Sequence, residues 1–210
     1  MHLHRATLID VDVVDDGGFR YTTAARTVMD IAREHGVSAG VVAADCALRR
    51  GLVDEDALAA EYERCATWPG RKAARLTLLG ADRLAESPLE SLSRLCMAAH
   101  GLPKPSLQTV IRDEHGQFVG RVDFYWDEFG VVGECDGELK YSDAATVTAE
   151  KRRQIAVTDT GLIVVRWDWA AVFAFGPVAR RLDTAFARGA HHGSPQRRWR
   201  VAPHDTRLHP

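Results

Sequence analysis

Two apolar strands joined by a four-residue turn, at residues 118–135, constrain the fold more than any other stretch of the sequence. The turn DEFG, at 127–130, has Asp at its first position and Gly at its fourth, which are residues that a type I turn prefers. Four-residue loops built on this turn commonly join the strands of a hairpin. We therefore expect an antiparallel hairpin in which Trp126 pairs with Val131.

Three carboxylates lie along these strands: Asp123 in the first, and Glu134 and Asp136 in and just after the second. In the expected register Asp123 is opposite Glu134, with Cβ atoms about 4.5 to 5.5 Å apart. Period-2 alternation puts Asp136 on the same face as Glu134. The alternative is a three-residue loop with a bulge, which would put the carboxylates on different faces.

A solvated sheet face is the usual explanation for charges in strands, but the flanking residues favour another. The stretches VVGEC and LIVVRW are apolar on both faces, which indicates burial between helices. Carboxylates held together in such a place need a cation or a shared proton. Because the ligands are all oxygen atoms, Mg²⁺ or Mn²⁺ suits them better than zinc does. The sequence therefore favours a metal-binding cluster over a solvated face.

The elements around the hairpin follow the order helix, three strands, helix, strand. The first helix, SPLESLSRLCMAAHG, has Ser87 at its N-cap, Pro88 at the first helical position and Gly101 beyond its end. The strand PSLQTVIRD precedes the hairpin. The helix ATVTAEKRRQIAVTD, the strand LIVVRW and a short helix at about 178–188 follow it. This order predicts an α/β fold.

The rest of the sequence indicates an N-terminal domain and a tail. Residues 1–84 predict a short β-hairpin followed by several capped helices, and hence a small, mainly helical domain. The α/β domain occupies residues 85–190. Residues 191–210 have no periodicity, and we expect them to be disordered.

Composition excludes several classes of protein. The net charge of −2 is not that of a generically basic nucleic-acid binder, so any such binding must use local patches. No apolar run reaches the roughly 18 residues of a membrane span, and no signal peptide begins the sequence, so we expect a cytoplasmic protein without membrane association. The cysteines form no C-x-x-C pair, which argues against a zinc site or a disulfide framework; they are Cys46, Cys65, Cys96 and Cys135.

The motifs SPLESL, RVDF, GECDG and EKRR…GLIVVRWDW together resemble the PD-(D/E)XK nuclease core. More closely, residues 87–171 are similar to the domain related to very-short-patch repair endonucleases. That domain stands at the C-terminus of many actinobacterial proteins assigned to the type IV abortive-infection antitoxin family. Residues 1–80, with TTAARTVMDIAR and DCALRRGL, resemble the middle region of the same proteins. The match lacks their winged helix-turn-helix, so direct promoter binding is not implied.

The resemblance implies an αβββαβ core and a Mg²⁺- or Mn²⁺-dependent DNA endonuclease. Asp123, Glu134 and Asp136 match its metal-binding acids, and Glu90 in SPLES matches a further acid that the family places on its first helix. Glu90 has a second explanation, because Ser87-x-x-Glu90 is also a capping box and Glu90 lies away from the helix's apolar face.

The third-strand signature departs from the family pattern. The family has acid-x-Lys, whereas this chain has Glu134-Cys135-Asp136, with Asp where Lys belongs. Two other lysines are candidates for the missing catalytic group. Lys140 follows the strand closely, and Lys151 lies at the centre of the apolar stripe of the crossover helix, between Val147 and Ile155.

Basic side chains near the expected cleft suit a DNA backbone, namely Arg152, Arg153 and Arg166. Our first hypothesis from the sequence is therefore a metal-dependent endonuclease with DNA as its partner. The alternative is a non-catalytic regulatory or binding module of the antitoxin kind, which keeps the nuclease fold and binds a protein, a nucleic acid or a second copy of itself.

Overall fold

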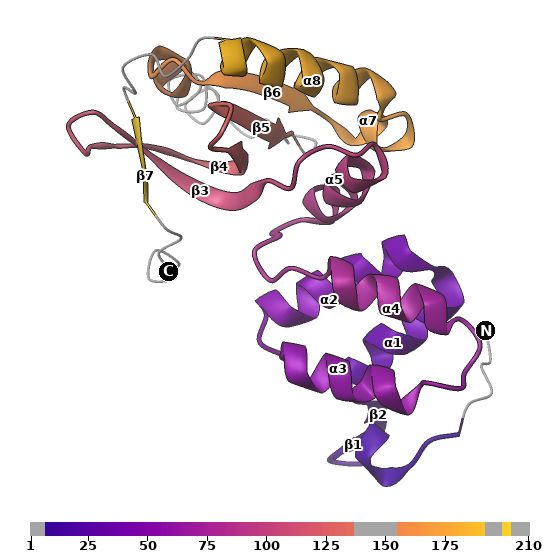
Figure 1. The fold of residues 1–210 in the computed structure, drawn as a ribbon. Helices are drawn as coiled ribbons and strands as arrows, with labels where there is room; N and C mark the ends of the chain where they lie inside the picture. The colour runs from indigo at the N-terminus through magenta and orange to yellow at the C-terminus, as the bar shows by residue number, and fades with distance from the viewer. Residues whose placement is uncertain (1–6, 137–154, 192–198, 203–210) are drawn as a thin grey trace. The chain divides into compact units, whose positions relative to one another are not determined.

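The computed structural model describes residues 7–136, 155–191 and 199–202, and it divides the chain into two compact units, residues 1–87 and 88–210 (Figure 1). The sequence placed this division after residue 84. Within the described ranges no helix is both long enough and apolar enough to cross a membrane.

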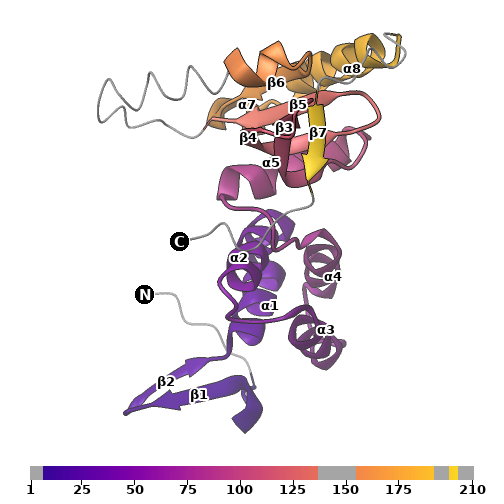
Figure 2. The same cartoon turned by 90° about the vertical axis from the view of Figure 1, so that its left-hand side faces the viewer.

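Unit 1 contains the predicted hairpin and four helices (Figure 2). Thr23 caps the first helix by accepting the N–H of Arg26, and Asp54 caps the third by accepting the N–H of Ala57. Gly40 allows close helix packing, because a Cβ there would lie 2.7 Å from the Cβ of Ala32. The elements are η1 (Asp10–Asp12), β1 (Val13–Asp16), β2 (Phe19–Thr22), α1 (Ala24–His35), α2 (Val37–Arg49), α3 (Glu55–Arg64) and α4 (Arg71–Gly80).

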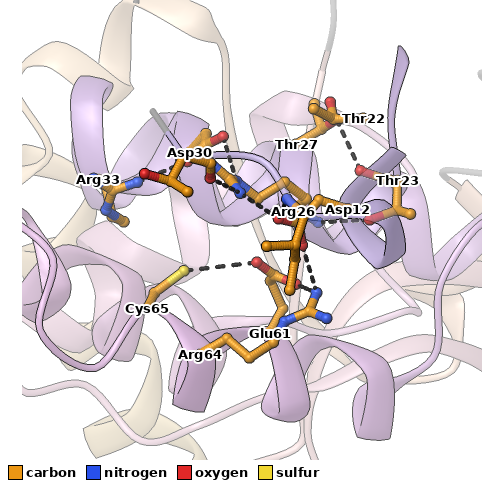
Figure 3. A network of polar contacts seen from close by, with 12 residues as sticks. Asp12, Thr22, Thr23, Arg26, Thr27, Asp30, Arg33, Glu61, Arg64 and Cys65 are labelled. Atoms are coloured by element: carbon orange, nitrogen blue, oxygen red, sulfur yellow. Dashed lines mark hydrogen bonds and ion pairs between the residues drawn. The ribbon is translucent and has the colours of Figure 1, made fainter. Parts of the chain in front are cut away.

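A buried network of ion pairs joins the hairpin to the helices (Figure 3). Arg26 is 0% exposed, and its guanidinium donates to Asp12 at 2.9 Å and to Asp30 at 2.7 Å. The ring of Trp68 stacks 4.5 Å from the same guanidinium. Arg64 also pairs with Asp12, at 3.0 Å. Because a two-stranded hairpin alone is barely stable in water, the pairs with Asp12, immediately before β1, hold it against the helices.

Replacing Arg26 by Ala should therefore destabilise unit 1 by about 3 to 5 kcal/mol, because the buried Asp12 and the partly buried Asp30 lose their shared cation. Urea unfolding followed by circular dichroism measures this loss. The matched control is Arg75→Ala on the exposed side of α4, which should change the free energy of unfolding by no more than about 0.5 kcal/mol. Equal effects of the two substitutions would contradict a structural role for the network.

Unit 2 is a mixed α/β unit built on a five-stranded sheet in the order β6-β5-β4-β3-β7 (Figures 1 and 2). The β5–β6 pair is parallel and the other pairs are antiparallel. Residues 155–159, directly before β6, are helical. The elements are α5 (Pro88–Ala99), β3 (Ser106–Asp113), β4 (Phe118–Trp126), β5 (Val131–Cys135), β6 (Ile163–Trp167), α7 (Trp169–Phe173), α8 (Gly176–His191) and β7 (Trp199–Ala202).

Aromatic side chains form much of the core of unit 2. The rings of Phe124 and Trp167 stack at 5.3 Å, and Trp126 meets Phe186 of α8 edge to face at 5.1 Å. The first pair joins β4 to β6, and the contact of Phe186 with Trp126 holds α8 against the sheet. A further cluster of buried residues includes Val132 and joins β5 to the segment before β6.

The hairpin has the predicted register. Trp126 pairs with Val131, Tyr125 with Val132 and Phe124 with Gly133, which confirms the four-residue loop. The alternative of a three-residue loop with a bulge is wrong.

The prediction of a disordered tail at 191–210 is wrong for residues 199–202, which form β7 and pair with β3. Trp199 is 7% exposed, and its indole N–H donates to the hydroxyl of Tyr125 at 2.9 Å. A strand of four residues is too short to show periodicity, and its partner is distant in sequence. Residues 192–198 and 203–210 of the predicted tail lie outside the described ranges.

Candidate acidic site where two strands diverge

Strands β4 and β5 separate at the acidic residues. Their backbone pairing ends at Phe124 and Gly133, so Asp123 and Glu134 are the next residues on the two strands. The carboxylate of Asp123 accepts the backbone N–H of Cys135 at 3.0 Å. Strand β5 meanwhile stays paired with β6 through Cys135. A side-chain carboxylate thus takes the place of a backbone acceptor where the strands diverge.

Arg166 of β6 supplies a positive charge to the acids of β5. The parallel register pairs Glu134 with Arg166. Glu134 is 3% exposed, and the Arg166 guanidinium donates to its carboxylate. The same guanidinium lies 3.6 Å from a carboxylate oxygen of Asp136. Arg166, which the sequence predicted to bind DNA, therefore partly compensates both acids of this strand.

Glu90 enters the same region from α5. Its side chain is buried, at 5% exposed, and accepts the amide N–H of Gln108 at 2.8 Å. The sequence placed Glu90 away from the apolar face of its helix, but the structure buries it against β3. Sequence reasoning missed Gln108, whose only signal was a polar residue inside the apolar strand SLQTVIRD.

The charges of these residues affect one another. Burial raises the pKa of Asp123 to about 6, the negative charges of Glu90 and Glu134 add to the rise, and the N–H of Cys135 opposes it. Glu90, Asp123 and Glu134 are therefore close enough to interact electrostatically. Burial and the charge of Asp123 also raise the pKa of the Cys135 thiol far above its ordinary value. Both effects disfavour the thiolate form of Cys135, so its thiol is poorly suited to act as a nucleophile.

The described residues include no group of three Asp, Glu, His or Cys side chains already gathered as a metal site. The donor chemistry nevertheless fits a hard cation, because the acids offer only oxygen atoms. Glu134 has Arg166 as its cation in this structure. The repulsion predicted between the acids is thus relieved in part by a guanidinium.

Four of the predicted site residues lie outside the described ranges: Lys140, Lys151, Arg152 and Arg153. Ile155 was predicted to belong to the apolar stripe around Lys151. It is 60% exposed, so this residue does not face the core as the stripe predicts.

Two open hollows adjoin each other along the edge strand β6. The first, of about 460 Å³, is lined by Arg166 and Arg181 among others. The second, of about 500 Å³, shares Arg181 and Val164 with the first and adds Arg180 and Arg188 of α8. Sequence reasoning missed these three arginines of α8, because nothing in the sequence shows that this helix lies beside β6.

Comparisons with known proteins find relatives without an assigned function. The chain is 34% identical over 149 residues to the uncharacterized proteins MT2308 and Rv2248 of Mycobacterium tuberculosis. The match covers 69% of this chain and 53% of each relative, so the chain spans about half the length of the curated relatives it matches. The chain matches no protein-family model and no solved structure.

The raised pKa of Asp123 predicts a pH-dependent difference between the wild type and Asp123→Asn. Between the ordinary value of 3.8 and the folded value of about 6, the native wild type binds more protons than the unfolded chain does. Its stability should therefore fall as pH rises through this window. Asparagine keeps an acceptor for the Cys135 N–H but does not titrate, so the variant should gain relative stability over the same window.

The expected gain is on the order of 2 kcal/mol, since a pKa unit corresponds to about 1.4 kcal/mol and solvent reaches this partly buried group. Urea unfolding in EDTA at several pH values between 4 and 7 measures it. Asp183→Asn, at an exposed carboxylate of α8, is the control and should track the wild type. A constant difference between Asp123→Asn and the wild type would contradict the burial of an ionisable Asp123.

Proposed function

We propose that unit 2 is a metal-dependent endonuclease domain that hydrolyses phosphodiester bonds of DNA, with a PD-(D/E)XK type of core. The observation that carries this proposal is the position of Asp123 where β4 and β5 diverge, close to Glu90 and Glu134. The order of elements around it, α5, then β3 to β5, then the helical residues 155–159 and β6, supports the same assignment.

Asp123 and Glu134 would hold a Mg²⁺ or Mn²⁺ ion, with Glu90 and Asp136 as further oxygen ligands. When bound, the ion would supply an activated water and would offset negative charge on the scissile phosphate. Burial is the main cause of the raised pKa of Asp123, and the negative charges of Glu90 and Glu134 that add to it favour a cation at this place. Lys140 and Lys151 keep their predicted role as candidate lysines of the site.

Arg166 would orient the phosphate next to the acids. It is 26% exposed at its side chain, and it lines the first hollow beside β6. A guanidinium binds phosphate oxygens in a fixed, two-pronged geometry. Arg166 already holds Glu134 and Asp136, so it links the acids to the place where a phosphate would bind.

Arg180 and Arg181 would continue this contact along the DNA strand. Both are exposed on α8, and the two adjoining hollows lead from Arg166 to them along the edge of β6. The whole chain carries a net charge of −2, so DNA binding requires a local patch of this kind.

Cleavage of labelled DNA, single-stranded and double-stranded, in Mg²⁺ or Mn²⁺ tests the proposed activity. The wild type should cleave one of the two forms in the presence of metal but not in EDTA. Asp123→Asn and Glu134→Gln should each lower the rate by about 100-fold or more, because a catalytic metal supplies several kcal/mol of transition-state stabilisation. Asp183→Asn should cleave like the wild type. Cleavage that survives both substitutions would contradict the proposed site.

The salt dependence of DNA binding tests the arginine surface. The double variant Arg180→Gln/Arg181→Gln should bind more weakly, and the slope of log affinity against log salt should shrink by about 0.9 for each lost phosphate contact. Fluorescence anisotropy in EDTA measures both quantities without cleavage. The matched control is Arg49→Gln/Arg50→Gln, another exposed pair of adjacent arginines, in unit 1. A larger loss in the control would place DNA binding on unit 1.

A specific observation also favours a second candidate, a non-catalytic module of the antitoxin kind. Arg166 already pairs with Glu134 and Asp136, and the described residues hold no ready-made metal cluster. In that case the acids are structural, and the partner is a protein, a nucleic acid or a second copy of the chain. The cleavage assay separates the candidates, because the module predicts no cleavage in any metal.

A further inference from the structure

Gln108 has an unusual backbone conformation. Its φ is 49°, and it is the only non-glycine with a positive φ among the residues that the structure describes. The residues on either side keep regular pairing with β4, Leu107 with Phe124 and Thr109 with Val122. A left-handed residue inside a strand costs on the order of 1 kcal/mol or more and persists only where its surroundings impose it.

The side chain of Gln108 binds one acid of the candidate site, and its backbone lies across from another. It is 2% exposed, and its amide donates to the carboxylate of Glu90 at 2.8 Å. The pairs on either side, Leu107 with Phe124 and Thr109 with Val122, put position 108 across from Asp123 on β4. Glu90 in turn lies close enough to Asp123 to contribute to its raised pKa. The strained Gln108 thus lies across from Asp123 on β4 and binds Glu90 of α5 through its side chain.

The amide of Gln108 holds the carboxylate of Glu90 without adding a charge of its own. An amide N–H is a neutral donor, so its hydrogen bond orients a carboxylate and leaves the carboxylate oxygens able to bind a cation. Gln108 is therefore suited to hold Glu90 in place as an oxygen ligand of a hard cation.

We infer that Gln108 is a positioning residue of the proposed nuclease site, which holds the Glu90 carboxylate beside Asp123 so that the two acids bind the metal together. This inference rests on the proposed function. It gives a reason for the strained φ of Gln108, because the amide reaches Glu90 from that conformation.

A double-mutant cycle with Mn²⁺ binding as the readout tests the inference. Isothermal titration of the full chain, without DNA, should show Mn²⁺ binding about 10- to 100-fold weaker in Gln108→Met than in the wild type, the usual effect of losing a group that orients a metal ligand. Glu90→Gln should weaken binding as well. The double variant should bind no more weakly than Glu90→Gln alone, because Gln108 acts only through Glu90.

Thr109→Val is the matched control, since Thr109 is the next residue on β3, is 5% exposed and loses only a hydroxyl. It should bind Mn²⁺ like the wild type. If Gln108→Met does not fold, Gln108→Asn replaces it in the cycle, because asparagine tolerates a positive φ but is one methylene shorter. It too should weaken Mn²⁺ binding.

The outcomes separate this inference from the proposed function. Wild-type Mn²⁺ affinity in the Gln108 variant, or independent and additive losses in the cycle, would overturn the positioning role and leave the nuclease proposal standing. A wild type that binds no Mn²⁺ would overturn both.

Discussion

The hydrogen bond from the N–H of Cys135 to the carboxylate of Asp123 is the interaction on which the candidate site depends. Strand β5 pairs with β4 as far as Gly133 and then follows β6 alone. The side chain of Asp123 satisfies a backbone donor that β4 no longer reaches, so the divergence leaves no orphaned N–H at this point. The same divergence leaves Asp123 next to Glu134 at the end of the pairing.

Buried like charges in this region are tolerated because each has a compensating partner of its own. Asp123 accepts a backbone N–H, Glu134 has the guanidinium of Arg166, and Glu90 has the amide of Gln108. Asp123 still has a pKa raised to about 6, so the compensation there is incomplete. A divalent cation would relieve what remains, since it favours the ionised form of every nearby carboxylate.

Local sequence chemistry was enough to predict the hairpin and its acids. The DEFG turn fixed the pairing of Trp126 with Val131, and counting back along this register puts Asp123 and Glu134 just beyond the last pair, Phe124 with Gly133. Capping residues were likewise enough to predict where α1 and α3 of unit 1 begin. These features depend on interactions between residues that are near in sequence.

Features that depend on tertiary contacts could not be predicted in this way. β7 exists because Trp199 finds Tyr125, a residue far away in the chain. Gln108 is visible only as a backbone outlier with a partner on another element.

Diffraction from crystals soaked in Mn²⁺, with an anomalous difference map, tests the central claim most directly. The account predicts an ion bound to Asp123 together with Glu90 or Glu134. An empty site, with Arg166 still bonded to Glu134, would contradict it.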